Sequence, residues 1–272
     1  MTRLYGVIGD PIAQSLSPLI HNGWMRDHNI GAEYRGLLVA RGELRSALET
    51  LAHRGVRGLN VTMPHKHEAL ALSEDVTPRA RAIGAANTLW RPGDGTWSAD
   101  NTDAPGFIAA LSPLLDAPLM GRRVLVLGAG GAARAIVYAL CENGASLVVA
   151  NRTQSKAEDM ASDFQGHDIL VMALDAALSA ADNFDLVINT TGIGHSGGQL
   201  SLAKSTGGLF YDISYGKAAD PMLQSAAASG WKTADGLSML VYQAAFAFER
   251  WFQVMPDVNK GLERARRVLE IA

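Results

Sequence analysis

The feature that most constrains this chain is the apolar run at residues 124–127, which leads directly into a Gly-x-Gly-x-x-Ala turn. The turn comprises Gly128, Ala129, Gly130, Gly131 and Ala132. Residues 133–140 then follow with a helical pattern of small and apolar side chains. This order of strand, turn and helix is the context that a dinucleotide-binding fingerprint requires.

Each small residue of the turn has a physical role in that interpretation. Gly128 allows the tight turn, Gly130 lets the backbone approach a pyrophosphate, and Ala133 lets the helix pack closely on the strand. The free N–H groups at the start of the helix would hold the phosphates. The alternative is a glycine turn that binds nothing.

The next predicted strand indicates which dinucleotide binds. It ends in Asn151, Arg152 and Thr153, and Lys156 lies one helical turn further on. An NAD site usually has Asp or Glu at the end of this strand to bind the ribose 2′-hydroxyl. Here a guanidinium could hold a 2′-phosphate instead, so the pattern favours NADP over NAD. The alternative is that Arg152 and Lys156 are simply a solvated helix start.

Composition narrows the class of protein. Net charge is −3, and no basic run suggests a nucleic-acid partner. The 48% apolar content supports a substantial core, and 272 residues suggest two domains at roughly 150 residues each. No apolar run approaches the ~18 residues of a membrane span, nor does the start read as a signal peptide. With Cys141 as the single cysteine, we expect a soluble, cytoplasmic protein.

The remaining pattern alternates strands with helices, which predicts an α/β fold with a doubly wound parallel sheet in the second half. In the first half, Ser17 before Pro18 predicts a helix N-cap. The strands expected there are residues 4–8, 33–38 and 58–62, and the helices are residues 19–27, 43–54, 65–72, 77–83 and 106–111. The strands expected in the second half are residues 123–127, 146–150, 169–171, 186–188 and 209–212, with a short piece around Trp231. Helices beginning near Gly236 and Asp257 end the chain.

A hairpin is expected at residues 87–100, around a loop at residues 92–95. A four-residue loop pairs Trp90 with Trp97 and Asn87 with Asp100. The hairpin therefore returns the chain to Asn87, and residues 101–103, which end in Asp103, should lie within a few ångström of it.

Polar residues follow a predicted strand where chemistry could occur. Asn60 and Thr62 point to one face of that strand, and Lys66 begins the next helix. A cation there is electrostatically misplaced unless a carboxylate such as Asp103 holds it. A Lys–Asp pair could relay a proton to a carbonyl oxygen as a hydride reaches its carbon. The alternative is an ordinary surface lysine.

Three further positions are of interest. Gln243 falls on an apolar helix face, so either a backbone group or a polar ligand must satisfy its amide. Thr190 and Ile213 follow the ends of two predicted strands, where ligands sit in open α/β sheets. They could line the nicotinamide end of a cofactor or be ordinary loop residues. His65 and His67 do not share a helix face, so no metal site is expected.

Seven segments together resemble the shikimate/quinate dehydrogenase family, in family order and over nearly the whole chain. They are residues 9–22 (GDPIAQSLSPLIHN), 60–66 (NVTMPHK), 84–88 (GAANT), 101–103 (NTD), 128–132 (GAGGA), 151–153 (NRT) and 235–244 (DGLSMLVYQA). Departures from the commonest family pattern occur at Gln14, Leu16, Gly192, His195 and Gly216.

The resemblance to the NADP-dependent shikimate dehydrogenases implies reduction of 3-dehydroshikimate to shikimate with NADPH, a step towards chorismate and the aromatic amino acids. It implies that Lys66 and Asp103 are catalytic. The implied substrate contacts are Ser15, Ser17, Asn60, Thr62, Asn87, Tyr215 and Gln243. The implied cofactor contacts include Gly236 and Met239. They also include the residues already discussed, namely residues 128–132, residues 151–153, Lys156, Thr190 and Ile213.

The resemblance also implies the architecture. Residues 1–103 and 238–272 would form an α/β substrate domain completed by the C-terminal helices, and residues 104–237 a Rossmann-like NADP domain across a cleft. Family members include monomers and homodimers. Two alternatives stay open: a quinate/shikimate dehydrogenase of broader specificity, and a nucleotide-sensing module without catalysis.

Overall fold

The computed structural model describes residues 3–93 and 95–271. The chain divides into two compact units, one formed by Met1–Phe107 and Leu240–Ala272 and the other by Ile108–Met239. Within the described ranges, no helix has the length and apolar character needed to cross a membrane.

The first unit is built on a six-stranded mixed sheet with the order β2-β1-β3-β5-β6-β4. Strands β2, β1 and β3 are parallel, whereas β5 runs antiparallel to both β3 and β6. The strands are β1 (Arg3–Gly9), β2 (Ala32–Leu38), β3 (Val56–Val61), β4 (Asp75–Val76), β5 (Thr88–Trp90) and β6 (Ser98–Asp100).

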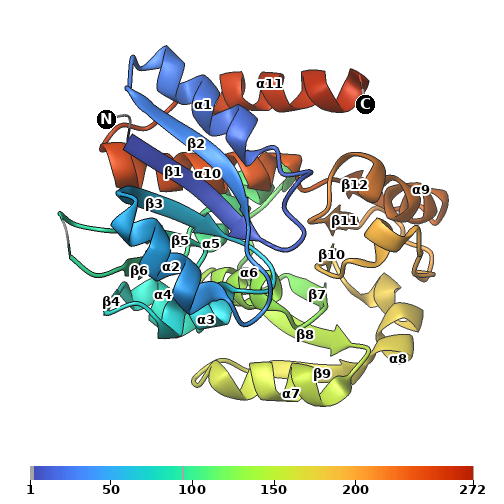
Figure 1. Cartoon of the computed structure of the whole chain (residues 1–272). Coiled ribbons are helices and arrows are strands. Elements are labelled where there is room, and N and C mark those ends of the chain that lie inside the picture. The colour runs from blue at the N-terminus through green and yellow to red at the C-terminus, as the bar shows by residue number, and fades with distance from the viewer. Residues whose placement is uncertain (1–2, 94, 272) are drawn as a thin grey trace. The chain divides into compact units, whose positions relative to one another are not determined.

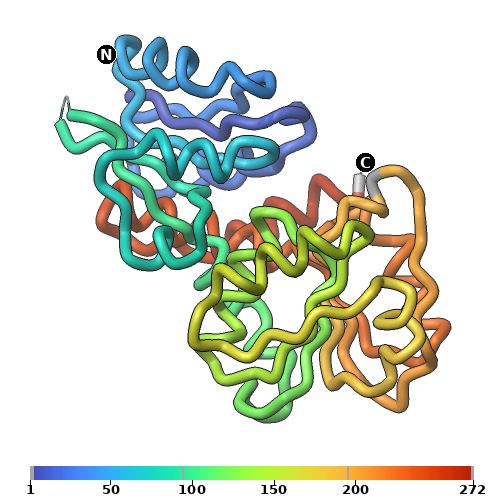
Figure 2. The backbone as a smooth tube through the Cα atoms, turned by 90° about the horizontal axis from the view of Figure 1, so that it is seen from below, coloured from blue at the N-terminus to red at the C-terminus, as the bar shows by residue number. Residues whose placement is uncertain are grey.

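Helices cover both faces of this sheet (Figure 1). They are α1 (Ser17–Asp27), α2 (Leu44–His53), α3 (Lys66–Ala71), α4 (Pro78–Ile83), α5 (Asp103–Leu111), α10 (Leu237–Phe252) and α11 (Val258–Ile271). Leu44, Leu48 and Leu51 of α2 enter an aliphatic core on one face. On the other face Tyr5 packs against Trp251 and Phe252 of α10, with ring centroids 5.2 and 4.8 Å away. Figure 2 shows the C-terminal segment running beside the N-terminal segments of this unit.

The second unit contains a six-stranded sheet in which every pairing is parallel, with the order β12-β11-β10-β7-β8-β9. The strand order reverses between β7 and β10, as in a doubly wound sheet. The strands are β7 (Arg123–Leu127), β8 (Ser146–Asn151), β9 (Ile169–Ala173), β10 (Leu186–Asn189), β11 (Leu209–Asp212) and β12 (Lys232–Ala234). The helices are α6 (Gly131–Glu142), α7 (Gln154–Asp163), α8 (Leu174–Ser179) and α9 (Asp220–Ala228), with short 3₁₀ turns η1 (Ser112–Leu114), η2 (Ala181–Asn183), η3 (Ile193–Ser196) and η4 (Gly216–Ala218). The predicted α/β class and parallel sheet are confirmed.

The predicted hairpin register is wrong by one residue. Trp90 lies opposite Ser98, and Thr88 lies opposite Asp100. Trp97 is buried in the aliphatic core on the α2 face, whereas Trp90 stacks under Arg250 of α10 on the other face. Two side chains that pack on opposite faces cannot be cross-strand partners. The packing of the two tryptophans therefore sets the register, rather than the four-residue loop that the sequence suggests. The predicted loop includes Asp94, which lies outside the described residues.

Two helix starts also differ from expectation. The N-cap of α1 is Leu16, and Ser17 is the first helical residue, so Ser17 is not the cap. Helix α5 begins at Asp103 rather than at residue 106. Its first two N–H groups, those of Asp103 and Ala104, donate to Asn101 Oδ1 at 3.0 and 3.4 Å. The Asn101 side chain therefore starts the helix early, a local capping effect that apolar periodicity does not reveal.

Candidate active site

Lys66 and Asp103 form a close ion pair in the first unit. Lys66 Nζ lies 2.6 Å from Asp103 Oδ2, and their side chains are 13% and 7% exposed. Lys66 is the first residue of α3, and Asp103 is the first residue of α5. A carboxylate is stabilised at a helix N-terminus, whereas a cation there needs a partner. Asp103 is therefore the partner that Lys66 needs, and Lys66 is not an exposed surface lysine.

Asn87 links Asp103 to the neighbouring strands. Asn87 Nδ2 donates to Asp103 Oδ1 at 2.8 Å. Its own Oδ1 accepts from the backbone N–H of Thr102 at 2.7 Å and from the hydroxyl of Thr88 at 2.9 Å. All four residues are buried. The expected proximity of Asn87 and Asp103 is confirmed despite the shifted hairpin register. Because its hydrogen bonds are satisfied, this cluster holds the carboxylate rigidly.

Gln243 joins the same cluster from α10. Its Oε1 accepts from Asn87 Nδ2 at 3.2 Å, and its Nε2 donates to the Leu240 carbonyl at 2.7 Å. The Leu240 carbonyl and the Asn87 side chain are therefore the partners that the structure shows for this amide.

Asn60 of β3 extends the cluster towards α1. Its Oδ1 accepts from the Tyr34 hydroxyl at 2.7 Å, and its Nδ2 donates to the Asn87 carbonyl at 3.2 Å. Burial raises the pKa of Tyr34 well above its usual value, against the opposing hydrogen bond with Ser17. Tyr34 therefore stays a neutral donor, and it connects Ser17 to Asn60.

The remaining predicted substrate residues of this unit lie after the ends of β1 and β3. Ser15 is half-buried, and its hydroxyl accepts from the Ser17 N–H at 3.3 Å. Thr62 is half-buried and follows β3, where its N–H donates to the Ile8 carbonyl at 2.9 Å. Carboxyl ends of adjacent parallel strands are where ligands bind in such sheets.

In the second unit, the glycine turn joins β7 to α6. Gly128 has φ +113°, and a Cβ there would lie 2.3 Å from Thr190 Oγ1, so this position requires glycine for conformation and for space. A Cβ on Gly130 would have open space around it. Packing within the protein therefore explains Gly128 but not Gly130. Gly130 is the N-cap of α6 and has no side chain to satisfy the N–H groups of Gly131 and Ala132, which suits an anion.

The residues that follow β8 remain open to solvent. Asn151 Nδ2 donates to the Thr153 carbonyl at 2.8 Å, which shapes the turn into α7. Arg152, Thr153 and Lys156 are exposed. No acidic residue occupies the strand end, so nothing there would repel a 2′-phosphate.

Thr190 and Ile213 follow the ends of β10 and β11, as the sequence predicts. Thr190 Oγ1 donates to the Leu127 carbonyl at 2.7 Å, so this hydroxyl has a structural role. Gly236 lies against Ile213, whose carbonyl oxygen would be 2.0 Å from a Cβ at that position. Met239 is buried, and Tyr215 is half-buried.

Comparison with known proteins identifies the family. A model described as shikimate dehydrogenase substrate binding domain matches residues 7–89, one described as shikimate / quinate 5-dehydrogenase matches residues 114–200, and a shikimate 5'-dehydrogenase C-terminal domain matches residues 236–266. The NADP(+) shikimate dehydrogenase of Hyphomonas neptunium is 50% identical over 270 residues, covering 99% of each chain. This chain belongs to the shikimate dehydrogenase family.

Solved structures of family members support the assignment. The Thermus thermophilus enzyme, solved with NADP(H) and shikimate, has a TM-score of 0.85 at 34% identity and covers 98% of this chain and 99% of its own. The Aquifex aeolicus shikimate dehydrogenase has a TM-score of 0.88 at 33% identity, covering 97% and 98%.

Several residues of this family member's polar clusters were not expected from the sequence. In the first unit they are Tyr34 and Thr88, whereas Thr102 was expected near Asn87 and donates its N–H to Asn87 Oδ1. In the second, Asn189 Nδ2 donates to Asp212 Oδ2 at 2.8 Å and ties the ends of β10 and β11 together. A polar residue at the end of an apolar strand was the available signal for Asn189 and Asp212. No local pattern indicated Tyr34.

Proposed function

We propose that this chain catalyses the reversible NADPH-linked reduction of 3-dehydroshikimate to shikimate, a step towards chorismate and the aromatic amino acids. The observation that carries the proposal is the shielded Lys66–Asp103 pair, bonded through Asn87 to Gln243. A fixed proton donor surrounded by amides and hydroxyls suits a small ketone that carries several hydroxyl groups.

Lys66 is the acid/base in this proposal. During reduction its Nζ gives a proton to the carbonyl oxygen, and during oxidation it takes that proton back. Asp103 Oδ2, 2.6 Å away, keeps the amine in place through a charge-assisted hydrogen bond. The second oxygen of Asp103 accepts from Asn87 Nδ2, which fixes the orientation of the carboxylate.

The neighbouring side chains orient the ring. Asn60, Asn87 and Gln243 present amide groups for the ring hydroxyls, and Ser15 and Ser17 present hydroxyls for the carboxylate, with Thr62 and Tyr215 as further contacts. Asn60 and Asn87 are held by several hydrogen bonds each, so little ordering accompanies binding.

NADP fits the residues of the second unit. The open space at Gly130 and the N–H groups of α6 suit a pyrophosphate, and Arg152 and Lys156 suit a 2′-phosphate beside Asn151. When bound, NADP supplies or accepts the hydride. We propose that the first unit binds the substrate and the second the cofactor, as a monomer or homodimer in the cytoplasm.

The deciding experiment measures initial rates for shikimate and quinate, each with NADP and NAD at equal concentrations. We expect the highest kcat/KM for shikimate with NADP. Comparable kcat/KM values for quinate would favour the broader quinate/shikimate dehydrogenase, and equal efficiency with NAD would overturn the role given to Arg152. If no shikimate-dependent NADPH forms, the chain is a binding module without catalysis.

A further inference from the structure

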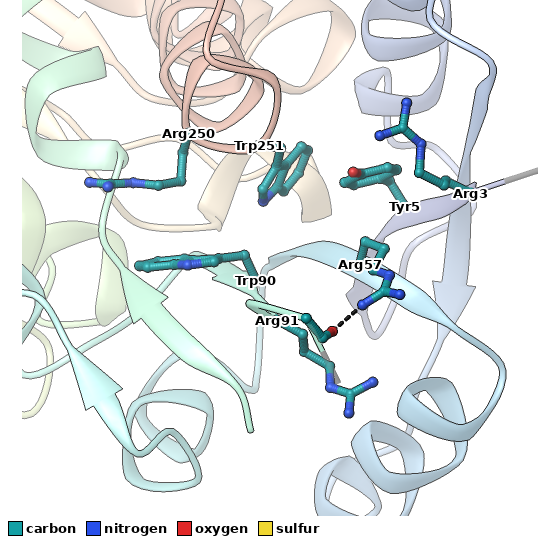
Figure 3. A pocket seen from close by; sticks show the side chains of 8 residues that line it. Arg3, Tyr5, Arg57, Trp90, Arg91, Arg250 and Trp251 are labelled. Carbon is teal, nitrogen blue, oxygen red and sulfur yellow. Dashed lines mark hydrogen bonds between the residues drawn. The ribbon is translucent and has the colours of Figure 1, made fainter. Parts of the chain in front are cut away.

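A pocket of the first unit is lined by residues of β1, β3, β5 and α10 (Figure 3). Arg3 is the first residue of β1 and Arg57 is the second residue of β3, so the pocket opens at the amino ends of these parallel strands. Lys66 follows the carboxyl end of β3. The two sites are therefore separated by about one strand length, ~20 Å for a six-residue strand.

Three aromatic rings form walls of this pocket. Tyr5 and Trp251 lie with ring centroids 5.2 Å apart, and Trp90 faces the same space from β5. Trp251 is fixed, because its Nε1 donates to the Leu89 carbonyl at 3.1 Å. A Cβ on Gly58 would lie 2.6 Å from Trp251, so glycine there allows the ring to sit against the sheet. The walls are therefore apolar, flat and held in place.

Three guanidinium groups, from Arg3, Arg57 and Arg250, lie around these rings. Arg91 also lines the pocket, but its guanidinium points away, over Trp97 at 5.7 Å from the ring centroid. Among the described residues that line the pocket none is acidic. Asp100, outside the lining, pairs with Arg250 at 3.1 Å and with Arg79 at 2.7 Å. The side chains that line the pocket are therefore net positive, which concentrates anions in a concave site.

Contacts within the protein hold two of these guanidinium groups in place. Arg250 lies over the Trp90 ring at 5.0 Å from its centroid. Arg57 donates to the Gly93 carbonyl. Burial raises the pKa of Tyr5, and the charges of Arg3 and Arg57 oppose that rise, so both charges act on the pocket wall.

We propose that this pocket binds a small organic anion that carries a flat ring and an acidic group, either a carboxylate or a phosphate. The ring stacks against the aromatic walls, and the acidic group pairs with the arginines. The cavity volume of about 350 Å³ is at the small end of ligand pockets, which suits a single-ring ligand.

The test is calorimetric titration of phenyl phosphate into the full chain, alone and saturated with NADP⁺ and 3-dehydroshikimate. These two compounds cannot react with each other, and they fill the sites proposed above. We expect one equivalent to bind in both cases. Inorganic phosphate, which lacks the ring, should bind at least about tenfold more weakly, and benzamide, which lacks the charge, should bind weakly too.

Matched variants locate the binding. The Arg3→Gln/Arg57→Gln pair should weaken phenyl phosphate binding about tenfold or more, whereas Arg41→Gln/Arg54→Gln, two exposed arginines of the same unit, should not change it. Trp90→Leu should weaken phenyl phosphate but leave inorganic phosphate unchanged. Thermal unfolding of each variant checks that it is folded.

Absence of saturable binding would overturn the proposal, as would equal loss in the two arginine pairs or equal affinity for inorganic phosphate. The readout is heat of binding to the chain rather than turnover. Failure here therefore leaves the proposed catalytic function standing.

Discussion

The two proposed binding regions are built in opposite ways. The cluster around Asn87 consists of buried side chains that hold one another through hydrogen bonds, and it draws on β3, β5, α5 and α10. The turn at Gly130 consists of backbone groups and open space, with exposed cations at Arg152 and Lys156. The difference follows from the ligands: ring hydroxyls need fixed donors and acceptors, whereas phosphates need N–H groups and charge.

This contrast separates function from stability in a testable way. In the Asn87 cluster, a substitution leaves buried partners unsatisfied and should affect both folding and catalysis. At the Gly130 turn, a substitution should affect the cofactor alone.

The largest expected effect is on the chemical step. Lys66→Ala should lower kcat by roughly 10²–10⁴-fold, the usual contribution of a positioned proton donor, while the KM for shikimate changes little. Steady-state kinetics in both directions measures this. Lys260→Ala, an exposed lysine of the same unit, is the control. A large rise in KM with kcat preserved would contradict the proton-transfer role.

The glycine turn allows a sharp comparison between two neighbours. Gly130→Val should raise the KM for NADP on the order of a hundredfold with no change in melting temperature, because its side chain meets only the space meant for phosphate. Gly128→Val should destabilise the fold itself, because φ there is +113° and the side chain would collide with Thr190. Equal loss of stability in both variants would contradict the cofactor role of Gly130.

Acid pH should lower the free energy of unfolding, because Asp100 loses its charge. Burial raises the pKa of Asp100, but Arg79, Thr77 and the Asn101 N–H outweigh that effect and hold the pKa below its ordinary value of 3.8. The ionised Asp100 therefore stabilises the fold above pH 3.8, and this contribution is lost as pH falls through the lower folded-state pKa. Asp100→Asn should cost about 2 kcal/mol of unfolding free energy at pH 7.

Denaturant unfolding at several pH values tests this prediction. The difference between Asp100→Asn and the parent chain should shrink as pH falls below 3.8. A difference that stays constant from neutral to acid pH would show that the carboxylate charge is not its source.

The smallest expected effect concerns the choice of cofactor. Arg152→Gln should lower kcat/KM for NADP about tenfold, the value of one charge-assisted contact to a phosphate, and leave kcat/KM for NAD unchanged. Lys204→Gln removes an exposed charge from the same unit and should change neither. Parallel losses with NADP and NAD would mean that Arg152 does not read the 2′-phosphate.

The sequence by itself determined the local elements and the chemistry they can support. Apolar runs and the glycine turn predicted the parallel sheet, because a buried strand and a tight turn leave few other choices of residue. The absence of a carboxylate at the end of β8 predicted NADP, because the choice between NAD and NADP depends on the residue at that one position. The hairpin placed Asp103 beside Asn87, since chain reversal is encoded within a few residues.

Tertiary structure alone decided the contacts between distant segments. The bond between Asn87 and Gln243 joins residues 156 positions apart, and that between Tyr34 and Asn60 joins β2 to β3. The hairpin register followed from Trp90 and Trp97 packing on opposite faces. The arginine pocket likewise gathers side chains from β1, β3, β5 and α10. Periodicity reports which residues are buried, but partners in a buried network are chosen by the packing of whole elements.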